Sequence, residues 1–125
     1  MVTIVRSVDE ELPEIRQGDV FWYDFGPANG SAPAERRPCV VVQSDFFNET
    51  RLRTTVVCVI TSNLHRASAP GNLVLPKGAA GLAKPSVVNV TQLYTVNKAA
   101  LWEHIGRVSA EAREAIRTGI QLLFD

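Results

Sequence analysis

Two short polar motifs stand next to apolar runs, at places where their side chains could handle a phosphate group. The first, Arg36-Arg37-Pro38, lies between a Gly- and Pro-rich segment and the apolar run Cys39–Val42. An arginine held at the start of a buried strand can offer its planar guanidinium to two phosphate oxygens at once. It could equally lie on the surface or form a structural ion pair, and spacing alone leaves both interpretations open.

The second motif is Thr61-Ser62-Asn63, which follows the β-branched run Thr54–Ile60. Short polar side chains that leave a buried strand together emerge at one edge of a sheet. They could donate hydrogen bonds to a phosphate or to the edge of a base. They could also cap a turn, and the sequence does not decide between these two roles.

The histidines and cysteines offer less. A ribonuclease can use two histidines as acid and base, but nothing in the sequence brings His65 and His104 together, so we interpret both as ordinary surface or hydrogen-bonded residues. Cys39 and Cys58 lie inside valine-rich runs and are interpreted as small buried apolar residues. Two distant cysteines and two distant histidines are too few for a zinc site, and we expect no metal and no cofactor.

Composition limits the class of protein. The 125 residues suit one domain, and an apolar content of 46% allows a packed core. Lysine plus arginine and aspartate plus glutamate number 13 each. This balance argues against coating of nucleic acid through bulk charge, although a local basic groove remains possible. No apolar run approaches the roughly 20 residues that span a bilayer, and the N-terminus lacks a signal-peptide core. We therefore expect a cytoplasmic protein with no membrane contact.

Several short apolar runs separated by turn residues indicate a β-rich domain. Gly26–Glu35 reads as a loop of about ten residues, long enough to be functional. A helical turn capped by Ser44 or Asp45 is expected next, and Leu101–Val108 could form a strand or a short helix. The segment His65–Gly71 is expected to be a loop. The predicted strands are Val20–Phe25, Pro38–Gln43, Thr54–Thr61, Asn72–Leu75, Ser86–Val90 and Gln92–Val96.

The last element is predicted to be a helix. Ser109 is a suitable N-cap, and Glu111 lies near the positive end of the helix. Many short strands followed by one helix indicate a mainly β fold with helices (α+β), as a strongly bent antiparallel sheet or small barrel. We predict a flexible extension over residues 1–14 and a single domain over residues 15–125. The residues expected on the buried helix face are Ala112, Ile116, Gly119, Ile120 and Leu123.

Six segments, in order along the chain, resemble the MazF/PemK family of toxin endoribonucleases, and together they cover roughly Ile15 to Leu123. Each segment is weak evidence by itself, whereas six in register are specific. The segments are Arg16–Pro27, Gly30-Ser31 followed by Arg37–Val42, Val59–Ser62, Ser86–Val90, Gln92–Lys98 and Ile105–Ser109.

This resemblance implies a Src-homology-3-type barrel of the PemK/CcdB kind that acts as a homodimer. It implies a type II toxin that cleaves single-stranded RNA at short preferred sequences without a metal. The products would carry 2′,3′-cyclic phosphate and 5′-hydroxyl ends, and translation and growth would stop. It also implies a cognate antitoxin whose disordered segment blocks the RNA groove.

Residue by residue, the resemblance assigns catalytic roles to Arg37 and Thr61. Arg37 suits the stabilisation of charge at phosphorus but cannot readily give up a proton, because its pKa exceeds about 12. Family members often have a glutamate where this chain has Ala32, so Glu35 is the remaining candidate base. The residues implied to contact RNA are Gly30, Ser31, Glu35, Ser62 and Gln92.

Two other classes compete with the ribonuclease interpretation. One is a gyrase-poisoning toxin of the CcdB type, and the other is a nucleic-acid-binding barrel without catalysis. The aromatic residues do not decide, since each could stack on bases or fill the core. We expect Trp22 to fill the core and leave Trp102 and Tyr94 undecided.

Overall fold

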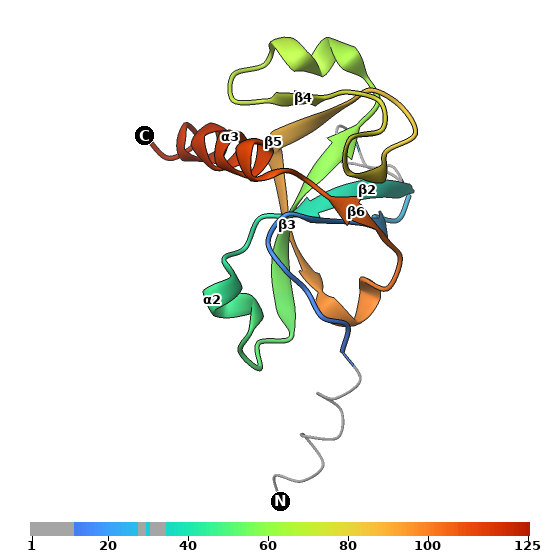
Figure 1. The fold of residues 1–125 in the computed structure, drawn as a ribbon, viewed down its shortest axis with the longest axis vertical. Helices are drawn as coiled ribbons and strands as arrows, with labels where there is room; N and C mark the ends of the chain where they lie inside the picture. The colour runs from blue at the N-terminus through green and yellow to red at the C-terminus, as the bar shows by residue number, and fades with distance from the viewer. Residues whose placement is uncertain (1–11, 28–29, 31–34) are drawn as a thin grey trace, which may run out of the picture.

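The computed structural model describes residues 12–27, 30 and 35–125, and it contains a curled sheet of antiparallel strands (Figure 1). Along the sheet the strands follow the order β4-β5-β3-β2-β1-β6. The mainly β prediction is therefore confirmed. The strands are β1 (Asp19–Asp24), β2 (Arg36–Val41), β3 (Thr54–Thr61), β4 (Leu73–Leu75), β5 (Ser86–Asn97) and β6 (His104–Arg107).

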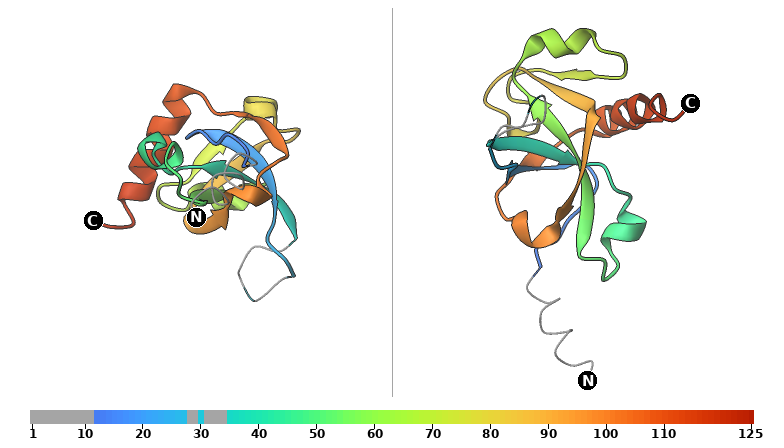
Figure 2. Two further views of the ribbon diagram at one scale, coloured as in Figure 1. Left: turned by 90° about the horizontal axis from the view of Figure 1, so that it is seen from below. Right: turned by 180° about the vertical axis from the view of Figure 1, so that it is seen from behind.

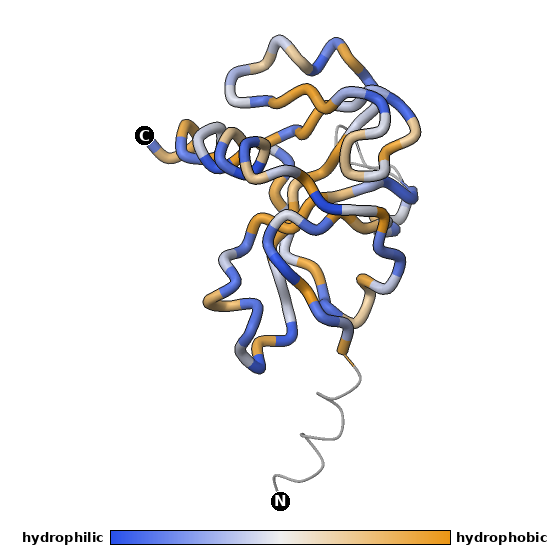
Figure 3. Tube along the Cα trace, in the orientation of Figure 1, coloured by the Kyte–Doolittle hydropathy of each residue, from blue (hydrophilic) through white to orange (hydrophobic). Residues whose placement is uncertain are grey.

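The sheet is buried on both faces, which explains why its central strands read as continuous apolar runs. Val40, Cys58 and Ile60 face a cluster that includes Ile116 of the C-terminal helix. The alternate residues, such as Cys39, face a second cluster on the other side of the sheet. Figure 3 shows this apolar character concentrated along the crossing strands at the centre of the molecule.

The sheet closes on itself as a half-barrel. The 3-10 turn η2 (Ala79–Gly81), between β4 and β5, contacts β6 at the opposite edge of the sheet. A Cβ atom added to Gly106 would lie 2.3 Å from the carbonyl oxygen of Ala80, so only glycine permits this approach. The backbone of η2 therefore packs directly against the backbone of β6 where the curled sheet closes.

Strand β5 corrects one prediction. The two short strands expected over residues 86–90 and 92–96 are one strand of 12 residues. Its pairing with β3 shifts between Cys58, which lies opposite Leu93, and Val59, which lies opposite Asn89. Residues 90–92 form the resulting bulge. The bulge interrupts the alternation of side chains, which is why the sequence pattern suggested a break.

The smaller elements mostly agree with the sequence pattern. Ser44 caps α2 (Asp45–Asn48), and its side chain accepts the N–H of Phe46. The segment 65–71 was expected to be a loop, but its first four residues belong to a 3-10 turn, η1 (Leu64–Ser68). A further 3-10 turn, η3 (Lys98–Ala100), precedes β6, so the undecided segment at residues 101–108 contains a strand.

The C-terminal helix α3 (Ala110–Gln121) packs across the sheet against β5 and β4, on the same side of the molecule as α2 (Figure 2). The predicted cap is confirmed, since Ser109 accepts the N–H of Ala112 at 3.1 Å. Ile116 and Gly119 are buried as expected. Leu123 lies beyond the helix and is 40% exposed, so its predicted place on the buried face was wrong. None of the helices in the described ranges is long and apolar enough to cross a membrane.

We expect Gly119→Ala to lower the free energy of unfolding by about 1–3 kcal/mol, the usual cost of overpacking. A Cβ atom there would lie 2.1 Å from the carbonyl oxygen of Gly71, which is main chain and cannot rotate away. The higher helix propensity of alanine offsets only about 1 kcal/mol. Urea unfolding measures the change, with exposed Thr118→Ala in the same helix as the control. Equal stability of the glycine and alanine forms would contradict this tight contact.

Candidate active site

The register of β2 and β3 brings the two predicted catalytic residues together. Cys39 lies opposite Val59. The paired register ends at these two residues, and counting two residues further along each strand brings Arg37 level with Thr61, at the end of the sheet where β2 begins and β3 ends. Residues directly opposite in an antiparallel pair share one face of the sheet, with Cα atoms about 4.5–5.5 Å apart. A guanidinium and a hydroxyl can therefore act on one group there.

Thr61 also has a local structural role. Its Oγ1 accepts the backbone N–H of Asn63 at 3.1 Å, and Asn63 in turn accepts the N–H of His65 through Oδ1 at 3.1 Å. The turn-capping interpretation of this motif is thus confirmed. A threonine hydroxyl has one donor and two acceptor sites. The contact uses an acceptor site of Thr61 and leaves its proton to donate to a phosphate oxygen.

A row of aromatic rings lies beside Arg37. Tyr23, on β1, is the register partner of Arg37. Its ring contacts Phe25 edge-to-face at 4.7 Å, and Phe25 contacts Tyr94 of β5 at 5.5 Å. All three are half-buried against the core. Tyr94 therefore packs within this row, and Gln92 lies two residues away in the bulge of β5.

The base of the long loop is fixed next to this row. The carbonyl of Glu35 accepts the N–H of Phe25 at 2.9 Å, and the N–H of Glu35 donates to the carbonyl of Gly26. Glu35 is exposed and has a φ of +59°, an uncommon value for a residue other than glycine. Gly30 is also exposed, with a φ of +63°. Ser31 and Ala32 lie outside the described residues.

A pocket of about 300 Å³ opens at the same end of the half-barrel. Its lining includes Arg37, whereas Thr61 is not part of the lining. Ser62 and Trp22 also line it. The prediction that Trp22 fills the core was wrong, because the indole is only half-buried and forms part of this pocket. Trp102 is 61% exposed and does not line the pocket.

Arg36, beside Arg37, is held in a defined position. Its guanidinium carbon lies 4.7 Å from the centre of the Trp22 ring, a cation–π geometry. It also forms an ion pair with Glu103, which precedes β6. The guanidinium is thus stacked on an aromatic ring at the mouth of the pocket and is 48% exposed.

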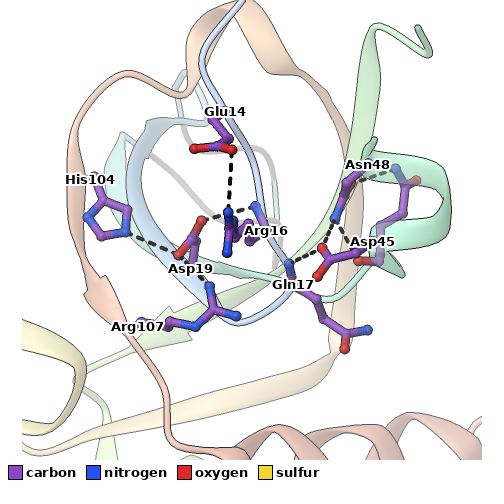
Figure 4. Close-up of polar contacts among 9 residues, drawn as sticks. Glu14, Arg16, Gln17, Asp19, Asp45, Asn48, His104 and Arg107 are labelled. Carbon is purple, nitrogen blue, oxygen red and sulfur yellow. Dashed lines mark hydrogen bonds and ion pairs between the residues drawn. The ribbon is translucent and has the colours of Figure 1, made fainter. Parts of the chain in front are cut away.

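A buried carboxylate that sequence reasoning missed lies at the start of β1, at the other end of that strand from the partners of Arg36 and Arg37 (Figure 4). Asp19 accepts the N–H of Arg16 at 3.0 Å, and its other oxygen lies 3.1 Å from Arg107 and 3.2 Å from Nε2 of His104. His104 is therefore a hydrogen-bonded histidine, as interpreted, while His65 is exposed in η1. These contacts of Asp19 connect β1 to β6. Its sequence signal is a lone aspartate at the start of an apolar strand.

The cysteines are buried and free, as expected. Burial raises the pKa of each thiol to about 12, so neither is a nucleophile at neutral pH. Over residues 12–27, 30 and 35–125 there is no group of three or more His, Cys, Asp or Glu side chains placed to hold a metal ion.

A curled antiparallel sheet with a C-terminal helix, and with an arginine and a threonine at the same end of two paired strands, defines the chain as a small half-barrel protein. The chain belongs to the family of PemK-like, MazF-like toxins of type II toxin–antitoxin systems, which matches residues 16–124.

Relatives and solved structures support this assignment. The chain is 42% identical to Endoribonuclease MazF2 of Mycobacterium bovis over 111 residues, covering 89% of this chain and 97% of that protein. It is 30% identical to Endoribonuclease MazF of Staphylococcus saprophyticus, covering 86% and 89%. MazF of Deinococcus radiodurans has the same fold, with a TM-score of 0.71 at 22% identity and coverage of 90% and 96%. A mycobacterial endoribonuclease in complex with its cognate antitoxin gives 0.72 at 18% identity, covering 88% and 94%.

Proposed function

We propose that this protein is a toxin endoribonuclease that cleaves single-stranded RNA in the cytoplasm without a metal ion. The observation that supports this most directly is that β2 and β3 are paired antiparallel, with Arg37 near the start of β2 and Thr61 at the end of β3, so that both lie at the same end of the sheet. Membership of the MazF-like family and the endoribonuclease names of the relatives point in the same direction. They favour this function over gyrase poisoning and over binding without catalysis.

In the proposed mechanism the 2′-hydroxyl of the RNA attacks the adjacent phosphorus, and the 5′-oxygen leaves. Negative charge grows on the non-bridging oxygens during the attack, and the Arg37 guanidinium stabilises it. The hydroxyl of Thr61 donates to one of these oxygens and fixes the phosphate relative to the attacking group. The leaving 5′-oxygen takes a proton from solvent water, so the products are a 2′,3′-cyclic phosphate and a 5′-hydroxyl.

The proton acceptor is the less defined part of the mechanism. Glu35 is the carboxylate nearest to Arg37 along β2, and its side chain is exposed at the base of the long loop. We propose it as the group that takes the proton from the 2′-hydroxyl. Further contacts to the RNA are proposed for Gly30, Ser31, Ser62 and Gln92.

The protein is expected to cut single-stranded RNA in the presence of EDTA, because the mechanism uses only protein groups. Digestion of an RNA with one labelled end, followed by analysis of the new ends, measures both the activity and its products. If the new 5′ ends can be phosphorylated without prior phosphatase treatment, they are 5′-hydroxyls, which matches the proposal. Activity that appears only after Mg²⁺ is added would contradict it, and a gyrase supercoiling assay tests the competing toxin class.

The proposed partners follow from the family. Structural relatives include a mycobacterial endoribonuclease bound to its cognate antitoxin and a complex of MazE with MazF from Deinococcus radiodurans. We propose that this chain likewise has an antitoxin, whose disordered segment covers the RNA-binding edge. We also propose a homodimer as the active form, which sedimentation of the purified protein can test.

A further inference from the structure

We propose that the pocket beside Arg37 binds one unpaired base of the RNA, next to the nucleotide whose phosphate is cleaved. This inference rests on the proposed endoribonuclease function and adds to it a site for base recognition. Trp22, on β1, and Arg36, on β2, supply the flat part of this pocket. It lies at the open mouth of the half-barrel, a common position for ligand sites in such folds.

The position of the pocket makes it continuous with the catalytic pair. Arg37 belongs to its lining, and Ser62 follows Thr61 directly in the chain. Strand alternation turns successive side chains to opposite faces of the sheet. An RNA whose phosphate is held by Arg37 and Thr61 can therefore pass round the end of the sheet and place a neighbouring base on the Trp22 side.

The Trp22–Arg36 pair is suited to binding an RNA base. The Arg36 guanidinium carbon lies over the Trp22 ring, 4.7 Å from its centre, and the guanidinium also pairs with Glu103. Unpaired RNA bases stack on aromatic rings and on arginine guanidinium planes. Because Arg36 is already ordered by its ion pair, binding loses little side-chain entropy.

The remaining lining supplies an apolar floor and a few polar groups. Ile60, Leu82 and Ile105 form the floor. The buried hydroxyl of Ser86 donates to the carbonyl of Lys84 at 2.9 Å, which fixes the segment after η2. The hydroxyl of Ser62 and the main chain of that segment can meet the polar edge of a base. Such polar contacts give discrimination between bases.

Size and charge select the occupant. A volume of about 300 Å³ has room for one base and not for several stacked bases. Among the described residues that line the pocket, three are cations, Arg36, Arg37 and Lys84, and none is acidic. This charge suits the phosphates on either side of a bound base. An apolar peptide side chain would use the floor but gain nothing from these cations.

Fluorescence of Trp22 tests the inference. The chain has two tryptophans, so Trp102→Phe leaves Trp22 as the sole reporter. The probes are short 2′-O-methyl oligoribonucleotides of mixed sequence, which cannot supply the attacking hydroxyl, and abasic oligomers of equal length. We expect quenching by the oligomers with bases and little by the abasic ones. Equal quenching by both, or quenching only by an apolar peptide, would overturn the base-binding pocket.

Kinetics supply the second readout. We expect Trp22→Leu to raise KM for RNA about tenfold, with a smaller change in kcat, because stacking on the ring is lost. We also expect a weaker preference at a nucleotide next to the cut. The matched control is Trp102→Leu, at an exposed tryptophan outside the pocket. If Trp22→Leu does not fold, Ser62→Ala and Lys84→Ala take its place in the test of sequence preference.

The outcomes separate this inference from the function beneath it. If the wild type cleaves RNA and the pocket variants keep its KM and its sequence preference, the base-binding pocket is contradicted and the endoribonuclease function stands. Absence of any wild-type cleavage would remove the endoribonuclease. In that case base-dependent quenching of Trp22 would still support the pocket, and its absence would overturn the pocket as well.

Discussion

Arg37→Ala is expected to lower kcat/KM for RNA cleavage on the order of 10²–10³-fold while the protein stays folded. This is the usual cost of removing one preorganised donor that stabilises charge in a transition state. Arg37 is half-buried at the start of β2, where its strand is anchored on both sides by β1 and β3. The truncation therefore removes a charge from the site without opening the core. Initial rates on a defined RNA, together with circular dichroism, measure both parts.

Arg117→Ala is the matched control for this variant. Arg117 lies on α3, where its side chain is 67% exposed and pairs with Glu114. Arg117→Ala removes one positive charge, as Arg37→Ala does. Arg117 lies away from the open end of the sheet. A rate for Arg37→Ala equal to that of Arg117→Ala would contradict the assigned role. Arg37→Lys distinguishes charge from geometry, since lysine keeps the charge but loses the two-pronged contact.

Asn48→Ala is expected to lower the free energy of unfolding by about 3 kcal/mol, because several buried groups lose their partners together. The side-chain oxygen of Asn48 accepts from Thr55 at 2.8 Å and from Gln43 at 2.9 Å. Its Nδ2 donates to the carbonyl of Gln43 at 2.9 Å and to Oδ1 of Asp45 at 3.1 Å, and Figure 4 shows the contact with Asp45. Thr55 is fully buried. Its hydroxyl would be left without this acceptor where water cannot reach it.

The same substitution loosens the contact between α2 and η3. Lys98, which is 4% exposed, donates from Nζ to the main-chain carbonyl of Asn48 at 2.9 Å. Because the acceptor is the main chain of α2, this contact depends on the position of that helix. Thermal unfolding should show a fall in Tm of roughly 10 °C. The control is Asn63→Ala, an exposed cap expected to cost less than about 1 kcal/mol. A similar small loss for both variants would refute the buried network.

Much of the fold could be predicted because local patterns and global structure agree. The buried run at residues 54–61 is β3, residue for residue. The caps Ser44 and Ser109 start the helices that they were expected to start. The division of residues 86–97 could not be predicted correctly, because a bulge is a property of two paired strands. The partner strand β3 decides it, and a single sequence window does not contain that information.

The candidate site shows the same limit. Arg37 and Thr61 were predicted as separate strand ends, and only the antiparallel pairing of β2 with β3 brings those two ends to the same end of the sheet. The cluster around Asp19 joins residues that are 85 and 88 positions apart. The exposure of Trp22 depends on how the half-barrel curls. Residue type and spacing indicate which groups could act, whereas pairing across the sheet determines which of them act together.

The pairing of β1 with β6 has a consequence for folding kinetics. It joins Asp19 to Arg107 and Val20 to Gly106, so most of the chain must be organised before this edge can form. Such non-local pairings place a domain among the slower folders, with refolding in milliseconds to seconds rather than microseconds. While β6 is undocked, β1 presents an unpaired edge that can pair with another chain. Refolding of this protein is therefore a competition between closure within one molecule and strand pairing between molecules, and dilution favours closure.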